Sequence, residues 1–237
     1  MDPVKPKRRY DSPRRAEQAR QTRAAVLDAA RRLFLHDGFA ATTIAAIAVE
    51  ARVSVETIYK AFGGKPGLVR AICASALAGE GPVPAETRSD ELQIREPDPR
   101  QIIRGWGKLT MEVAPRVAPI LLLVRSAAAT DPEMAGLRAE MDTGRLSRMT
   151  QNARNLAKAG HLRDDITVEQ AGEVLWTYSS PELYELLVLG RGWPTERYGT
   201  FIADAMIAAL LPPEPHASSE PAPLIPPTSR PHRHGPR

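Results

Sequence analysis

The stretch TTIAAIAVEARVSVETIYKAFGGKPGL, residues 42–68, decides the fold of this chain. Its first apolar residues recur at positions i, i+3, i+4 and i+7, which predicts a short helix with one buried face. These residues are Ile44, Ile47, Ala48 and Ala51. Either Thr42 or Thr43 stands where a side-chain oxygen would cap the free backbone amides at the start of this helix.

A second short helix is predicted from Val55 to about Phe62, after a turn at Arg52 and Val53 and a cap at Ser54. Its two sides differ in chemistry, so one is expected to pack and the other to face outward. The packing side holds Val55, Ile58 and Phe62, the outward side holds Glu56, Thr57 and Lys60, and Tyr59 lies at the border. Two glycines then end the helix, and a Lys-Pro pair opens a third one.

Two short helices joined by a tight turn, the second with a polar outer side, are typical of a helix-turn-helix that places a recognition helix in the DNA major groove. The same pattern also fits an ordinary corner between two helices of a bundle. The surrounding sequence favours DNA binding. The segment FLHDGFAATTIAAIA precedes the pattern VS-x-x-T-x-Y-x-x-F, which starts at Val53, and Lys65 and Leu68 follow it.

Through these residues, the stretch from Val26 to Ile72 resembles the DNA-binding domain of the tetracycline-repressor-like (TetR) family of bacterial transcriptional regulators. The resemblance implies an all-α homodimeric repressor whose C-terminal helical bundle binds a small effector. One residue departs from the family pattern, because Arg52 stands where members usually carry glycine. If this residue takes a left-handed conformation, arginine costs about 1 kcal/mol more than glycine.

The predicted DNA contacts follow from the resemblance and from the two sides of the second helix. Two copies of this helix would enter successive major grooves of a near-palindromic operator, with half-sites about 34–36 Å apart. Glu56 and Lys60 would face base edges. The remaining predicted contacts, which hold phosphates or lie beside them, are Thr43, Ser54, Val55, Thr57, Tyr59 and Lys65.

Composition agrees with a helical, DNA-binding chain. The sequence is 43% hydrophobic but only 5% aromatic, which suits closely packed helices. Residues 1–73 hold 14 Lys and Arg against 7 Asp and Glu, whereas the rest of the chain holds 18 against 21. A basic head on a slightly acidic body points to a polyanionic partner at one end. With no apolar run long enough for a membrane span and no secretory signal, the sequence predicts a cytoplasmic protein.

The chain is predicted to divide into five segments. Residues 1–13 form a disordered basic arm, 14–78 the DNA-binding domain, 79–98 a long loop, 99–211 a helical ligand-binding and dimerisation domain, and 212–237 a disordered Pro-rich tail. Within the body, Pro115 is expected to end one helix and start another. The lone Cys73 is expected to be a packed thiol rather than a redox switch.

The body is expected to hold an effector pocket with mostly apolar walls, between its helices. The predicted lining residues are Trp106, Thr110, Leu122, Arg125, Met141 and Trp176. Arg125 would pair either with an acidic ligand or with an acidic residue of the protein itself.

Two late helices carry more apolar surface than one monomer core requires, which suggests a partner face, and the resemblance implies the same. The residues predicted for this homodimer interface are Tyr184, Leu187, Tyr198, Phe201, Ile202, Ala205 and Met206. The alternative is that these helices complete the monomer.

No sequence motif for catalysis, nucleotide binding or metal binding is present, so neither an enzyme nor a cofactor is predicted. His232 and His234 in the tail are two ligands and make no metal site. Other interpretations stay open: an activator or effector-independent DNA-binding protein of the same shape, an all-α enzyme, and a helical scaffold that binds only proteins. The effector, operator and regulated genes are not encoded in any recognisable pattern.

Overall fold

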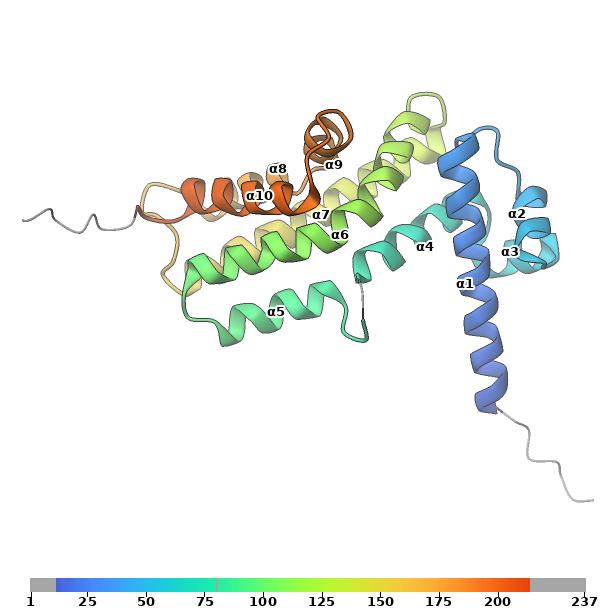
Figure 1. Cartoon of the computed structure of the whole chain (residues 1–237), viewed down its shortest axis with the longest axis horizontal. Helices are drawn as coiled ribbons and strands as arrows, with labels where there is room; N and C mark the ends of the chain where they lie inside the picture. The colour runs from blue at the N-terminus through green and yellow to red at the C-terminus, as the bar shows by residue number, and fades with distance from the viewer. Residues whose placement is uncertain (1–11, 80, 214–237) are drawn as a thin grey trace, which may run out of the picture.

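The computed structural model describes residues 12–79 and 81–213, and this part of the chain contains helices and no strands, as predicted. The structure has two parts (Figure 1): an N-terminal head at one end and a longer helical body beside it. The predicted Pro-rich tail from residue 214 onward and residues 1–11 of the predicted arm lie outside the described residues.

Four helices make up the head: α1 (Ser12–Asp37), α2 (Ile44–Ala51), α3 (Val55–Phe62) and α4 (Lys65–Ala78). Helix α1 stands across the end of the body, with α2 and α3 on its outer side and α4 leading into the body (Figure 1). Their apolar sides meet in one core, in which Phe34, Ile47, Ile58 and Leu68 are fully buried. The predicted helix-turn-helix is therefore formed, with α3 as its second helix.

The body begins with α5 (Ala85–Arg95), followed by the long helices α6 (Pro99–Ala127) and α7 (Pro132–Lys158). After α7 come α8 (Val168–Tyr178) and the short α9 (Pro181–Tyr184). Helices α6, α7 and α10 lie along the long axis of the body, and α5 lies along α6 (Figure 1). None of the described helices is long and apolar enough to cross a membrane.

The chain then forms a π-helical turn, η1 (Glu185–Leu189), and ends its described part with α10 (Thr195–Leu210). Helices α6 and α10 cross closely where two glycines meet. A Cβ atom added to Gly107 would lie 2.7 Å from the carbonyl oxygen of Gly199, and one added to Gly199 would lie 2.7 Å from that of Gly107. Only glycine allows this approach, because real Cβ atoms stay farther from backbone oxygen.

Two predictions for the body are wrong. The segment 79–98 is not one long loop, because residues 85–95 form α5, which turns Ala85 and Ser89 inward and is joined to α6 by an ion pair between Arg88 and Glu112 (2.6 Å). Nor does Pro115 divide two helices, since α6 runs through both Pro115 and Pro119. The packing of α6 on its neighbours outweighs the roughly 3 kcal/mol cost of a proline inside a helix.

The core of the head extends into the body. Ile120 and Val124 of α6, and Met134 and Leu137 of α7, belong to the same buried cluster as the apolar residues of α1–α4. A second cluster fills the rest of the body between α6, α7, α8 and α10. The head is thus packed directly on the ends of α6 and α7, so a shift of these helices changes the packing of the head core.

Candidate nucleic-acid interface and body cavity

Both helices of the helix-turn-helix begin with side-chain caps. Thr43 accepts a hydrogen bond from the backbone N–H of Ala46 (3.1 Å), and Ser54 accepts one from Thr57 (3.1 Å). Thr43, not Thr42, is the cap of α2, because the buried Thr42 hydroxyl lies 2.8 Å from the carbonyl oxygen of Gly38, to which it donates. These caps fix where α2 and α3 begin and hence which residues α3 turns outward.

Arg52 takes the left-handed conformation in which arginine is expected to be strained. Its φ and ψ are 55° and 44°, and it is the one non-glycine residue with positive φ in the described part of the chain. Its backbone N–H closes the last turn of α2, at the start of the turn to α3. The turn therefore stores a modest strain of about 1 kcal/mol that glycine would not have.

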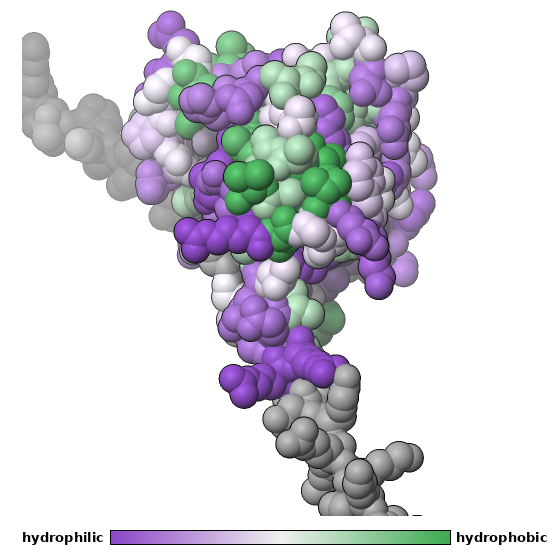
Figure 2. Space-filling model, turned by 90° about the vertical axis from the view of Figure 1, so that its right-hand side faces the viewer, coloured by the Kyte–Doolittle hydropathy of each residue, from purple (hydrophilic) through white to green (hydrophobic). Residues whose placement is uncertain are grey.

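Helix α3 offers a mixed surface to the outside. Glu56, Thr57 and Lys60 are exposed as predicted, and the Tyr59 side chain is 53% exposed. Val55, expected on the packing side of the helix, is 40% exposed, so only Ile58 is deeply buried. Figure 2, which looks onto the head, shows a small apolar area ringed by hydrophilic residues. The outward face can therefore make both polar and apolar contacts with a partner.

Lys65 does not point outward. Its ammonium group donates to the carbonyl oxygens of Phe39 (2.6 Å) and Thr42 (3.0 Å) and lies 4.3 Å from the centre of the Phe39 ring. Burial lowers the pKa of this ammonium group. Lys65 thus fastens the start of α4 to the connection between α1 and α2, and its contact with a DNA phosphate stays a prediction.

Arg23 lies beside the end of α3. Its guanidinium carbon is 4.6 Å from the centre of the Phe62 ring at the end of α3, although Arg23 itself belongs to α1. The side chain is exposed. Nothing in the sequence indicated its contact with Phe62. It adds a positive charge next to the outward face of α3.

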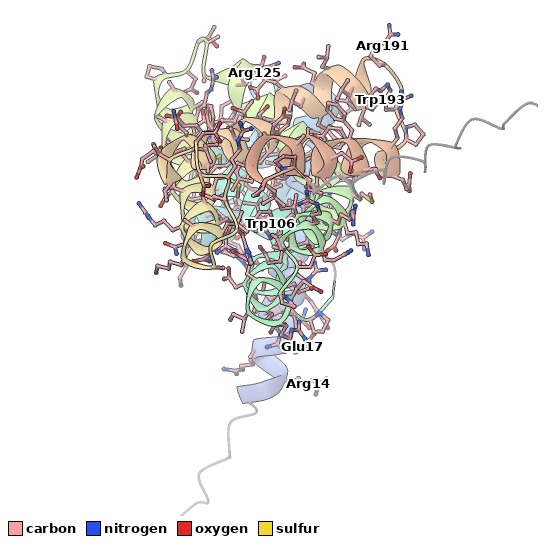
Figure 3. All side chains as sticks on the ribbon, turned by 90° about the vertical axis from the view of Figure 1, so that its left-hand side faces the viewer. Arg14, Glu17, Trp106, Arg125, Arg191 and Trp193 are labelled. Atoms are coloured by element: carbon pink, nitrogen blue, oxygen red, sulfur yellow. The ribbon has the colours of Figure 1, made fainter. Side chains whose placement is uncertain are left out.

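The body contains a cavity of about 810 Å³, open on one side, that is lined by residues of α4, α5, α6, α7, α8, α9 and α10. Four of the predicted pocket residues line it: Trp106, Thr110, Arg125 and Met141. Trp106 lies among the body helices and Arg125 nearer their edge (Figure 3). Leu122 and Trp176 do not line the cavity. Leu121 lines it in place of Leu122, and the Arg145 guanidinium covers the Trp176 ring at 4.4 Å.

Arg125 resolves the choice that the sequence left open. Its guanidinium lies 2.6 Å from Glu185 and 3.5 Å from Glu182. The hydrogen bond to Glu185 is the main reason why the pKa of Arg125 is raised. Arg125 thus pairs with acidic residues of the same chain.

The cavity and the core of the head share a wall. Cys73 of α4 and Val124 of α6 line the cavity and also belong to the buried cluster of the head, while Met141 of α7 lines the cavity and packs against that cluster. Burial raises the pKa of the Cys73 thiol to about 12, in keeping with the predicted packed thiol. A change in the cavity can therefore reach the head without an intermediate element.

Most of the predicted dimer residues are placed otherwise. Tyr184, Tyr198, Ile202 and Met206 lie in the core of the monomer, with at most 6% of their surface exposed. Helical spacing identified an apolar side of α10 correctly, but this side packs on the chain's own helices. The predicted residues Leu187 and Ala205 are half-buried, and Phe201 is 39% exposed. Nearby, Leu186 (61%) and Leu189 (57%) are more exposed.

These features define a helix-turn-helix protein whose head is packed on a hollow helical body. A sequence profile described as "Bacterial regulatory proteins, tetR family" matches residues 26–72. The uncharacterized HTH-type transcriptional regulator YvkB of Bacillus subtilis (strain 168) is 38% identical over 71 residues, which are 30% of this chain and 38% of that relative. Residues 26–72 form a TetR-family DNA-binding domain, and the chain has the TetR-family fold.

Solved structures share this fold over most of the chain. The SmeT–triclosan complex covers 90% of this chain and 99% of its own, with a TM-score of 0.62 and 20% identity. A putative TetR-family regulator from Syntrophomonas wolfei covers 79% and 94%, with a TM-score of 0.64 and 17% identity. NalD of Pseudomonas aeruginosa, the secondary repressor of the MexAB-OprM multidrug efflux pump, covers 81% and 98%, with a TM-score of 0.62 and 19% identity.

Proposed function

We propose that this protein is a homodimeric transcriptional repressor that binds a DNA operator through α3 and leaves it when a small molecule enters the body cavity. One observation carries the proposal: the core of the head buries the inner side of α3 through Ile58, and two members of the same core, Cys73 and Val124, line the cavity. The family likeness favours a regulator over the all-α enzyme or the protein-binding scaffold.

The proposed contacts with DNA come from α3 and its surroundings. Lys60 favours guanine acceptors in the major groove and Glu56 accepts from cytosine, each contact giving about 1–3 kcal/mol of discrimination. Thr57 and Tyr59 are exposed beside them and would hold phosphates, as would the Arg23 guanidinium near Phe62. Thr43 and Ser54 act first as helix caps, which place amides at helix starts toward phosphate oxygen.

Release by an effector follows from the shared wall. Helix α4 lines the cavity and leads directly to α3, and Arg70 on α4 makes a two-pronged ion pair with Glu140 on α7 (2.7 and 3.2 Å). A molecule that fits the cavity better when α4 and α7 are displaced shifts the population toward that arrangement. The spacing between the two heads of a dimer then no longer matches the operator.

The relatives support repression and a small-molecule ligand. SmeT was solved as a complex with triclosan, and NalD is described as a repressor of a multidrug efflux pump. The cavity volume of about 810 Å³ lies in the range of pockets that hold drug-sized molecules. For the dimer, we propose a contact surface that contains Leu186, Leu189 and Phe201, the exposed apolar side chains of η1 and α10.

DNA binding tests this function directly. Fragments selected from random or genomic DNA by the full-length protein should be bound with a steep salt dependence and a shared sequence. Lys60→Ala should relax the preference at one position of each half-site and weaken binding about 5- to 100-fold. Lys108→Ala removes the same charge from an exposed position on α6 and should change neither property. Equal, weak binding of all sequences by both variants and by wild type would reject the proposal.

A further inference from the structure

The charged side chains around the cavity already have partners of opposite charge, which bears on the ligand that the proposed function requires. Arg148 lies 2.6 Å from Asp90 and 3.3 Å from Glu86. Arg125 is paired with Glu185, as described above. The cavity is otherwise lined mostly by apolar side chains.

Besides the pairs of Arg148 and Arg125, a third set of paired charges, centred on Asp142, lies beside the cavity. Asp142 lies 3.4 Å from Arg145 and 3.7 Å from Arg138. Arg145 also donates to the hydroxyl of Ser179 (3.1 Å) and to the backbone oxygen of Trp176. An anionic ligand would have to compete with the carboxylates that already neutralise Arg125, Arg145 and Arg148, and a cationic ligand with the arginines that already neutralise those carboxylates.

Neutral polar groups in the cavity are, by contrast, free. Tyr184 and Tyr198 line the cavity with 6% and 1% of their surface exposed, and their rings meet edge to face with centroids 5.6 Å apart. Within the described part of the chain, neither hydroxyl forms a hydrogen bond, and neither is sealed off from the cavity. Burial raises the pKa of Tyr198 to about 12, so this phenol stays protonated and able to donate.

The amide of Asn152 adds to this neutral set. Asn152 also lines the cavity and is 4% exposed, and its Oδ1 accepts from Gln93 at 3.3 Å, which leaves its NH₂ group to donate elsewhere. Buried donors without acceptors are uncommon in folded proteins, and a ligand oxygen would satisfy them.

We infer that the cavity takes an uncharged, largely apolar molecule with a hydrogen-bond-accepting oxygen, and that Tyr184 and Tyr198 donate to that oxygen. This inference rests on the proposed function, since it names the class of its effector. The ion pairs leave none of the charged side chains named above without a counter-charge for an ionic ligand to supply, the apolar walls bind the carbon skeleton, and the two phenols fix its orientation.

A series of ligands that share one two-ring skeleton tests this class. Diphenylmethane has no oxygen, benzophenone adds a carbonyl, and 4-benzoylbenzoate and 4-(aminomethyl)benzophenone add a negative and a positive charge. Their affinities are measured with the full-length protein by displacement of the neutral dye Nile red. Benzophenone should bind about fivefold more tightly than diphenylmethane, and both charged analogues should bind at least about tenfold more weakly than benzophenone.

Three variants locate the contacts. The double substitution Tyr184→Phe, Tyr198→Phe should abolish the advantage of benzophenone over diphenylmethane while keeping the affinity for diphenylmethane. Tyr178→Phe, outside the cavity, should keep that advantage. Val113→Trp should weaken every ligand, because Val113 lines the cavity but packs in neither core cluster.

Several results would overturn the inference: binding by none of the compounds, a charged analogue that matches benzophenone, equal affinities of benzophenone and diphenylmethane, or an advantage that survives the double substitution. DNA binding by the same preparations separates this failure from that of the proposed function. Operator binding with preference for a charged analogue would reject the ligand class alone. If the ligands bind in the expected order but the protein binds no DNA sequence specifically, the proposed regulatory function would be rejected and the ligand class would be kept.

Discussion

At the scale of single residues, Arg52 shows a local cost that the fold tolerates. Arg52→Gly should raise the free energy of unfolding by up to about 1 kcal/mol, since it removes left-handed strain but loosens the unfolded chain. Ala45→Gly is the matched control on α2 and should lower it by about 1 kcal/mol, because Ala45 is helical. Urea denaturation measures both changes. Destabilisation by both variants would show that the strain at Arg52 is negligible.

Cys73 predicts how stability depends on pH. Its pKa is about 12 in the folded chain and about 8.5 in an unfolded one, so the folded state keeps a proton that the unfolded state loses. This stabilisation is complete below about pH 8.5 and is lost as pH rises toward 12. Between pH 9 and 11, Cys73→Ala should reduce the fall in unfolding free energy by up to about 1.4 kcal/mol per pH unit. An unchanged slope in urea titrations would contradict the buried thiol.

Lys65 distinguishes a structural role from a phosphate contact. Lys65→Met keeps the stem but removes the donors to Phe39 and Thr42, and should lower the unfolding free energy by about 1–3 kcal/mol. Lys60→Met on the exposed side of α3 should leave stability unchanged within about 0.5 kcal/mol. Thermal or urea unfolding decides between the roles. A fully stable Lys65→Met variant that had lost only DNA affinity would support the phosphate contact inferred from the family.

At the scale of helices, the contact between α6 and α10 depends on two glycines. Gly199→Ala should destabilise the fold by about 1–3 kcal/mol, because its Cβ would lie 2.7 Å from the Gly107 oxygen. Gly136→Ala, in the interior of α7 with open space around it, should stabilise the fold by about 1 kcal/mol. Denaturation curves of both variants check the pair. Equal effects of the same sign would mean that α6 and α10 do not cross as closely as described.

The helices that the sequence predicted well are those with local signals. Helices α2 and α3 each carry a capping side chain, a regular apolar spacing and a turn, and all of these act within a few residues. The sequence did not predict α5, because prolines and glycines flank it and its apolar stripe is weak. Contacts with α6, such as the ion pair between Arg88 and Glu112, stabilise it instead. Pro115 misled for a related reason, since packing along α6 overrides a local preference.

At the scale of the whole molecule, sequence reasoning identified surfaces but could not say what covers them. Tyr198 and Ile202 have the spacing of an apolar helix side, and that spacing is the same whether the helix packs on its own chain or on a partner. The cavity shows the same limit. Met141 and Trp106 line it, but Trp176 is covered by Arg145, a contact between residues of different helices that no local pattern records.

The link between cavity and head also belongs to the whole molecule. Cys73 and Val124 line the cavity and also belong to the core of the head, which contains Ile58 of α3. The cavity wall and the inner side of α3 are therefore packed in the same cluster. The ion pair between Arg70 and Glu140 joins α4 and α7, the two helices that the proposed release mechanism would displace. These contacts arise between segments far apart in the sequence, which explains why the spacing of residues along single helices did not indicate them.

The measurement that tests the central claim most directly is a hydroxyl-radical footprint of the full-length protein on its selected DNA. The account predicts two equal protected regions related by a pseudo-twofold axis. Their centres should lie about 34–36 Å apart along the DNA, which is the spacing of successive major grooves. Lys60→Ala should weaken protection in both regions equally. A single protected region, or selected DNA whose protection does not respond to Lys60→Ala, would contradict a dimer that reads DNA through α3.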